Sequence, residues 1–96
     1  MSSLIWSAAA LSDVQRLYRF PAPKSQTAAK QAVAAIRRAV RWLQAYPHLG
    51  KRTFHLGPGH RQLAVPFGAE GYVVFYVVSG GVVTILAVKH QRECAP

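Results

Sequence analysis

Histidine and arginine side chains are the groups in this 96-residue chain that suggest chemistry. Metal-free cleavage of RNA requires a group that takes the proton of the 2′-hydroxyl, and cations that stabilise the phosphorane. We predict that one set of such groups meets at one end of a sheet and forms the catalytic set if the protein is a nuclease: His60, Arg61, His90 and Arg92. The alternative is that these histidines are ordinary polar residues at strand ends.

Other reactive groups match no known type of site. No structural zinc motif fits the spacing of the four histidines, at positions 48, 55, 60 and 90. Cys94 is the single cysteine, so it forms no internal disulfide, and we expect an inert thiol because no ordered base accompanies it. The stretch Gly57-Pro58-Gly59 precedes no predicted helix and is therefore not a phosphate-binding loop. We expect neither a metal nor a cofactor.

The charge of the chain indicates the kind of partner. The chain has twelve lysines and arginines but only three acidic residues, Asp13, Glu70 and Glu93, so its formal net charge is +9. So basic a small domain favours an anionic partner, either nucleic acid or an acidic protein segment. The alternative is that the charge only aids solubility. The scarcity of acids argues against paired-carboxylate catalysis and against calcium or magnesium sites.

Length and composition favour a single cytoplasmic domain. Ninety-six residues leave no room for a second core, and 51% hydrophobic residues can form one without disulfides or metal. No apolar run reaches the roughly 18 residues of a membrane helix, and the first residues lack the basic region of a signal peptide. We therefore expect one soluble domain over residues 1–96, with residues 91–96 as a flexible polar tail and no membrane contact.

Two helices are predicted in the first half of the chain. Residues 4–6 read as an edge strand, and Ser7 is a plausible N-cap for a helix over residues 8–19. Residues 20–23, Phe-Pro-Ala-Pro, end that helix. Ser25 or Thr27 caps a second helix that reaches about Tyr46. Its apolar stripe predicts the buried face: Ala29, Val33, Ile36, Val40 and Leu43.

A basic strip lies beside that stripe, formed by Lys30, Arg37 and Arg41 with Arg38 next to them. Such a strip is often no more than a solvated flank. Trp42 lies away from the apolar stripe. We predict that it packs against the first helix, with an exposed aromatic anchor as the alternative.

The second half predicts a three-stranded antiparallel meander. After an irregular loop, residues 61–67 form a strand and residues 68–71 a turn. Residues 72–90 then form a hairpin around Gly80-Gly81, because two glycines supply the positive φ angles of a type I′ turn. The predicted fold class is α+β, with an N-terminal strand, a two-helix hairpin and the meander, giving one sheet with both helices on one face.

Hairpin pairing predicts which residues share a sheet face. It places Val78 opposite Val83, Tyr76 opposite Ile85 and Val74 opposite Ala87. These residues, with Leu63, Val65 and Phe67 of the preceding strand, are expected under the helices. The other face has no cover from this chain, and an uncovered apolar face indicates a partner site. Its expected members are Gln62, Ala64, Pro66, Val73, Phe75, Val77, Thr84, Leu86 and Val88.

Five stretches, taken in order, resemble the ParE branch of the ParE/RelE superfamily of type II toxins. They are WSAAALSDV from Trp6, AIRRAVRWLQAYPHLGK from Ala35, RQL from Arg61, YVVFY from Tyr72 and ILAVKH from Ile85. The resemblance implies the same strand, two-helix and meander fold. It also implies a ParD-like antitoxin, whose C-terminal segment wraps the toxin, and a higher-order toxin–antitoxin complex as a further option. Similar sequences usually have Glu in place of Gln62 and often Arg in place of Ala87, and these positions bear on toxicity.

The resemblance leaves three functional readings. The first is a toxin that inhibits DNA gyrase by binding, and the second is a RelE-like ribosome-dependent mRNA endoribonuclease. The third is a basic nucleic-acid-binding module without toxicity. For the first, we expect target contacts at Arg61, Lys89, His90 and Arg92. We expect antitoxin contacts at Val73, Phe75, Val77, Leu86, Arg37, Arg41 and Trp42.

Overall fold

The structure is a computed structural model that describes residues 2–19 and 25–94, without the side chain of Phe54. The predicted helix stop at residues 20–23 lies outside the described residues. The elements follow one another as β1 (Ser3–Trp6), α1 (Ala8–Arg19), α2 (Gln26–Ala45), β2 (Lys51–Arg52), the 3₁₀ helix η1 (Phe54–Leu56), β3 (His60–Phe67), β4 (Glu70–Ser79), β5 (Val82–His90) and the 3₁₀ helix η2 (Gln91–Cys94).

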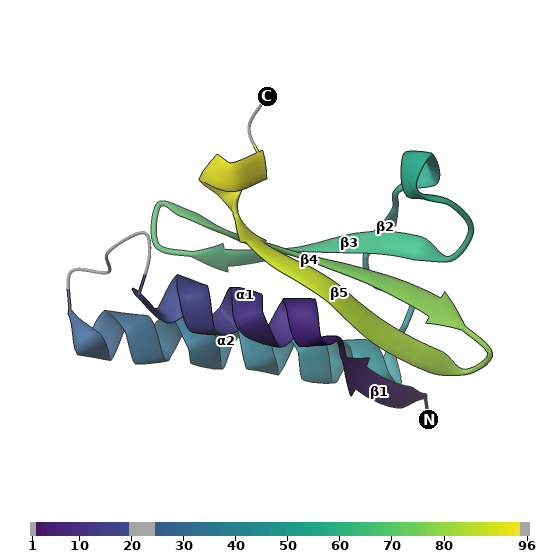
Figure 1. Cartoon of the computed structure of the whole chain (residues 1–96), viewed down its shortest axis with the longest axis horizontal. Coiled ribbons are helices and arrows are strands. Elements are labelled where there is room, and N and C mark those ends of the chain that lie inside the picture. Colours follow the sequence, from purple (N-terminus) through teal and green to yellow (C-terminus); the bar gives the residue numbers. More distant parts are fainter. Residues whose placement is uncertain (1, 20–24, 95–96) are drawn as a thin grey trace.

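The molecule has two layers, a five-stranded sheet and a pair of helices on one of its faces (Figure 1). The strand order is β1-β5-β4-β3-β2, with β1 parallel to β5 and the other neighbours antiparallel. This confirms the predicted α+β class. The one additional strand is β2, whose two residues pair with β3. Among the described helices, none is both long and apolar enough to span a bilayer.

Both helices begin at the predicted caps. The Ser7 hydroxyl oxygen accepts a hydrogen bond from the Ala10 N–H at 3.0 Å, and the Ser25 hydroxyl oxygen accepts one from Ala28 at 3.1 Å. Capping in this way satisfies backbone donors that have no partner inside the helix. The buried face of α2 differs from the prediction at one position, because Ala32 is buried where Val33 was expected and Val33 is only half-buried.

The central hairpin turns where the two glycines predicted it. Gly80 and Gly81 have φ angles of 58° and 75°, as a type I′ turn requires. Side chains on the helix-covered face of the sheet form the core with α1 and α2. Its strand members are Val65, Tyr72, Val74, Tyr76, Val83, Ile85 and Val88.

A β-bulge in β5 changes the predicted pairing. Val78 does face Val83 and Tyr76 does face Ile85, but Val74 faces Val88, and Ala87 faces Phe75 instead. The predicted Val74–Ala87 pair is therefore wrong. The register shift leaves Leu86 as the extra residue on β5, and an extra residue reverses the alternation of faces beyond it. Val88, expected on the open face, is consequently fully buried in the core.

The C-terminal segment, predicted as a flexible tail, forms a short 3₁₀ helix against the sheet over residues 91–94. Residues 91–94 form η2, and the Glu93 carboxylate accepts a hydrogen bond from the His90 N–H at 2.9 Å. Arg92 pairs with Glu70 of β4 at 2.8 Å. These contacts hold η2 against the end of the sheet, and residues 95–96 lie outside the described part.

Candidate functional site

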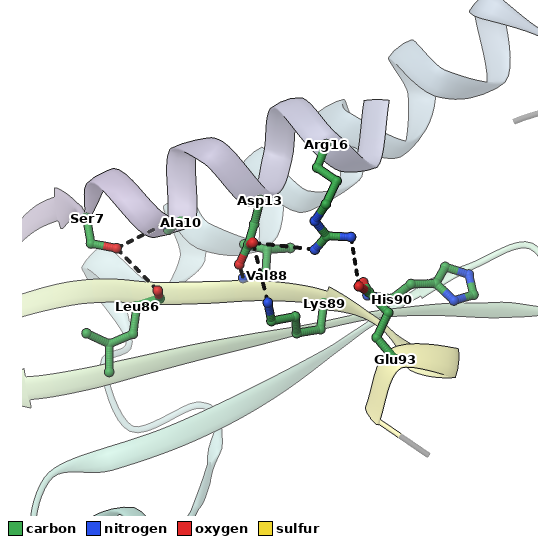
Figure 2. A network of polar contacts seen from close by, with 9 residues as sticks. All are labelled: Ser7, Ala10, Asp13, Arg16, Leu86, Val88, Lys89, His90 and Glu93. Carbon is green, nitrogen blue, oxygen red and sulfur yellow. Dashed lines mark hydrogen bonds and ion pairs between the residues drawn. The ribbon is translucent and has the colours of Figure 1, made fainter. Parts of the chain in front are cut away.

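The open face of the sheet carries the predicted apolar surface. Val73, Phe75 and Val77 alternate with core residues along β4 and therefore share the face away from the helices. Figure 2 shows the Leu86 side chain of β5 pointing away from α1, on the same side of the sheet. Phe75, Val77 and Leu86 are each half-buried without a covering helix. We call Val73, Phe75, Val77 and Leu86 together the open-face patch.

Polar groups surround a hollow of about 480 Å³ at the η2 end of this face. Val73 and Phe75 contribute apolar walls, and Lys89, Glu93 and Cys94 lie around them. Burial raises the pKa of the Cys94 thiol, which the Glu93 charge reinforces and the Lys89 charge opposes. A thiol with a raised pKa stays protonated near neutral pH, so Cys94 lacks the thiolate that a nucleophile needs.

The four residues predicted as a catalytic set do not meet. His60 pairs with Val77 near the end of β4, whereas His90 pairs with Tyr72 near its start. Five residues of extended β4 separate the two positions, which amounts to roughly 17 Å. The prediction failed because β3 and β5 both run antiparallel to β4 and so run in the same direction as each other. The first residue of β3 and the last residue of β5 must then lie at opposite ends of the sheet.

Three members of the predicted target site make contacts within the chain. The Arg61 Nη1 donates to the carbonyl oxygens of Gly50 at 2.7 Å and His48 at 3.3 Å. Lys89 lies 3.4 Å from the Asp13 carboxylate. His90 is nearly buried, and its ring packs edge-on against Tyr72 with centroids 5.3 Å apart. Their role in target binding stays a prediction.

A network of polar contacts joins α1, β5 and η2 (Figure 2). The Asp13 carboxylate accepts a hydrogen bond from the Val88 N–H at 3.0 Å and pairs with Arg16 and Lys89. Arg16 also donates to Glu93 at 2.7 Å. Because β1 ends at Trp6, the edge of β5 beyond it has no strand neighbour, and side chains of α1 bind that edge instead.

The same network explains the pKa of Glu93. Burial alone would raise the pKa of this carboxyl group, but the His90 N–H and the Arg16 guanidinium hold it below its usual value. All three acidic residues of the chain are thus engaged with cations around α1, η2 and the start of β4.

The solvent side of α2 carries the second group of predicted antitoxin contacts. Arg37 and Arg41 are exposed there and line a hollow of about 370 Å³ with Leu4 and Trp6 of β1. Trp42 is 54% exposed and stacks on Tyr46, with ring centroids 5.7 Å apart. The prediction that Trp42 packs on α1 is wrong, and the arrangement matches the exposed-aromatic alternative.

His60 and Arg61 meet residues that the sequence reasoning did not single out. They line a cavity of about 500 Å³ with His48, Arg52, residues 57–59 and Val78. Arg52 and Arg61 are directly paired between β2 and β3. The pairing depends on β2, which follows Gly50 and has two residues. So short a strand cannot be recognised in the sequence by periodicity. Among the described residues, no three His, Cys, Asp or Glu side chains are grouped as a metal site.

Comparison with known proteins identifies the family. The model of the ParE toxin of type II toxin–antitoxin systems, parDE, matches residues 4–94. The chain belongs to this ParE toxin family. A curated relative, Toxin RelE3 of Caulobacter vibrioides, is 32% identical over 81 residues, which is 84% of this chain and 85% of the relative.

Solved structures of toxin–antitoxin systems have the same fold as this ParE-family chain. The chromosomal ParDE system from P. aeruginosa aligns with a TM-score of 0.76 and 26% identity, covering 94% of this chain and 96% of the other. The RelBE2 complex from Mycobacterium tuberculosis aligns with a TM-score of 0.65 and 21% identity, covering 93% and 96%. The intact E. coli RelBE complex gives a TM-score of 0.63 and 17% identity, covering 93% and 95%. The last two likenesses concern the fold alone.

Proposed function

We propose that this ParE-family toxin acts by binding a protein target, DNA gyrase, and that an acidic ParD-like antitoxin neutralises it. The observation that carries the binding mechanism is the open-face patch. Its centre is apolar, and the candidate acid–base and cationic groups are divided between opposite ends of the sheet. An apolar surface with a polar rim suits protein docking better than phosphodiester cleavage.

Charge supports an acidic antitoxin as the partner. The chain carries +9, and its three carboxylates are already paired with its own cations. The solvent side of α2 offers Arg37 and Arg41 beside the exposed Trp42. An acidic amphipathic segment would therefore find both charge and apolar area there, and coupled folding on such a surface gives tight binding despite its ordering cost.

The second candidate is a ribonuclease that acts on messages at the ribosome. It is favoured by the RelE name of a relative that is 32% identical. The hollow beside η2 offers Lys89 and Glu93 near Gln62 as polar groups on the open face. The two candidates differ in what they stop first, because gyrase inhibition halts DNA synthesis and message cleavage halts translation.

The decisive experiment is induction of the toxin in cells without antitoxin, followed by pulse labelling of DNA and protein. We expect selective loss of DNA synthesis, and inhibition of supercoiling by purified gyrase. Val77→Asp, which places a charge in the open-face patch, should abolish both effects. Leu11→Asp, at a 51% exposed position of α1, is the matched control and should remain active. Cleavage of translated messages with unimpaired DNA synthesis would refute gyrase binding in favour of the ribonuclease.

Antitoxin binding requires a separate measurement. The double change Arg37→Glu and Arg41→Glu should weaken binding of the antitoxin's acidic segment by two orders of magnitude or more, since it replaces attraction by repulsion. The gyrase assay without antitoxin should be unaffected. Unchanged antitoxin affinity would exclude the solvent side of α2 as its docking surface.

A further inference from the structure

A basic cavity lies between the α2–β2 connection and the start of β3. It encloses about 500 Å³ and is lined by His48, Arg52, residues 57–61 and Val78. We call it the basic cavity. It lies outside the open-face patch and the solvent side of α2, and it shares only Arg61 with the predicted target contacts.

The electrostatics of the basic cavity favour an anion. Arg52 and Arg61 are directly opposed across β2 and β3, and like charges in such cross-strand positions repel. His48 and His60 line the same space, and no acidic residue does. The three acidic side chains lie on α1, at the start of β4 and in η2, toward the other end of the sheet. The residues that line the cavity therefore bring two arginines together and include no acidic side chain.

The donors of the cavity are held in place before any ligand binds. Arg61 uses Nη1 to bind the carbonyl oxygens of His48 and Gly50, while its Nε and Nη2 hydrogens have no acceptor among the described residues. The His60 Nδ1 lies 3.2 Å from the Pro58 carbonyl. A carbonyl only accepts, so Nδ1 carries the hydrogen and Nε2 remains available to a ligand.

The glycine loop that forms one wall is equally constrained. The Gly59 carbonyl accepts a hydrogen bond from the Val78 N–H at 2.9 Å, and the His60 N–H donates to Gly57 at 3.3 Å. A Cβ at Gly59 would stand 2.5 Å from the Val78 carbonyl oxygen, at a φ of 76° that disfavours other residues. Glycine at this position is what lets the loop approach β4 so closely. The wall is thus part of the folded framework.

The size of the cavity selects among anions. A single carboxylate or inorganic phosphate fills a small part of about 500 Å³, a volume typical of sites for whole small ligands. Imidazole rings, guanidinium planes and the Pro58 ring are surfaces on which a nucleobase stacks. We propose that the basic cavity binds one nucleotide unit, with its phosphate on Arg52 and Arg61 and its base against the histidine and proline rings. The unit comes either from a free nucleotide or from a single strand.

The test uses the purified full-length chain and isothermal titration at fixed salt with three probes: 5′-AMP, adenosine and a five-residue oligoadenylate RNA. We expect AMP to bind at least tenfold more tightly than adenosine, because the phosphate supplies the charged contacts. Equal affinity for AMP and RNA identifies a free nucleotide as the source. RNA that binds much more tightly than AMP identifies a strand.

Variants assign the binding to the cavity. Arg52→Gln should weaken AMP or RNA binding about tenfold, and it should reduce the salt dependence of RNA binding by about 0.7 in log–log slope. His48→Gln should also weaken binding, since its exposed side chain is lost while its backbone contact to Arg61 remains. Arg38→Gln removes one equal charge from α2 and should bind as wild type.

Two results would overturn the proposal. One is the absence of binding for both AMP and RNA at millimolar concentration. The other is binding that Arg52→Gln and His48→Gln leave intact but that Trp42→Ala abolishes, which would assign the nucleic acid to the exposed aromatic pair on α2. Circular dichroism of each variant shows that it is folded, and both cavity positions are exposed, so the substitutions leave the core unchanged.

Discussion

The hydroxyl group of Tyr76 should be a large single contributor to stability. Tyr76 is fully buried on β4, and its oxygen accepts a hydrogen bond from the Gly50 N–H at 2.8 Å. The same hydroxyl donates to the Pro47 carbonyl at 2.8 Å. These two bonds attach the turn after α2 to the centre of the sheet. Replacing Tyr76 by phenylalanine removes both while keeping the ring in the core.

The expected cost follows from the partners left behind. The Gly50 N–H is buried, and an unsatisfied buried donor costs about 1–3 kcal/mol. The Pro47 carbonyl is partly exposed, so water replaces much of its lost bond, for about 0.5–1 kcal/mol. Tyr76→Phe should therefore lower the free energy of unfolding by about 2–3 kcal/mol. For a domain of this size, the midpoint of thermal unfolding should fall by at least roughly 8 °C.

Tyr72→Phe is the matched control. Tyr72 is also on β4 and only 7% exposed, but its hydroxyl has no hydrogen-bond partner among the described residues. Its loss should change stability by less than about 0.5 kcal/mol. Urea unfolding, monitored by circular dichroism, gives the free energy of unfolding of both variants. The comparison is matched because each variant has lost one hydroxyl oxygen. A Tyr76→Phe protein as stable as Tyr72→Phe would refute the reasoning from unsatisfied partners.

The pH dependence of stability provides a second test of the role of the Tyr76 hydroxyl. Burial raises the pKa of Tyr76 above the ordinary 10.0, although the Gly50 N–H and the Arg61 charge oppose the rise. A raised folded-state pKa stabilises the folded protein fully below pH 10, and that contribution is lost as pH rises from 10 through the folded-state pKa. Wild type should therefore lose more stability than Tyr76→Phe between pH 9 and 12.

Three further predictions concern the network, η2 and the glycine turns. Asp13→Ala should lower the free energy of unfolding by about 2 kcal/mol, because the Val88 N–H loses its hydrogen-bond acceptor. Asp13→Asn keeps an acceptor, so it should lower the free energy of unfolding, measured with urea, by less than about 1 kcal/mol. The lowered pKa of Glu93 stabilises the folded state above pH 4.5, and this contribution is lost as pH falls below that value. The protection factors of the η2 amides, which are corrected for the intrinsic exchange rate at each pH, should therefore decrease there, and Glu93→Gln should remove this decrease. Gly59→Ala should lower the free energy of unfolding by more than about 3 kcal/mol, because its Cβ would collide with the Val78 carbonyl oxygen. Gly80 has open space around it, so Gly80→Ala should lower the free energy of unfolding by about 1–2 kcal/mol, from its positive φ alone. Equal thermal shifts for the two glycine variants would contradict the role assigned to close approach at Gly59.

Local features of the fold were predictable because they depend on neighbouring residues. The N-caps at Ser7 and Ser25, the helix at residues 8–19 and the turn at Gly80-Gly81 all rest on short-range geometry. The apolar content of residues 72–88 likewise predicted a sheet with one face under the helices and one face uncovered. These are the features that propensity and periodicity report.

The wrong predictions concern features that depend on strand register or on the packing of segments far apart in the sequence. The bulge at Leu86 moves Val88 into the core, and no local signal marks the extra residue. Trp42 is 54% exposed and stacks on Tyr46, and helical periodicity alone could not decide whether it meets α1 or solvent. The contact of Glu93 in η2 with Arg16 could not be predicted from local patterns either, because the two residues are 77 positions apart in the chain.

The histidines and arginines illustrate the division between sequence and structure. By itself, the sequence determined that the chain is basic, that its acids are few, and that His60 and Arg61 lie at one strand end and His90 at another. Only the tertiary structure decided that these ends are opposite and that His60 and Arg61 meet His48 and Arg52 instead. The reason is that residue type and spacing set each strand's local form, whereas strand direction and pairing, which depend on the packing of the whole chain, decide which strand ends become neighbours.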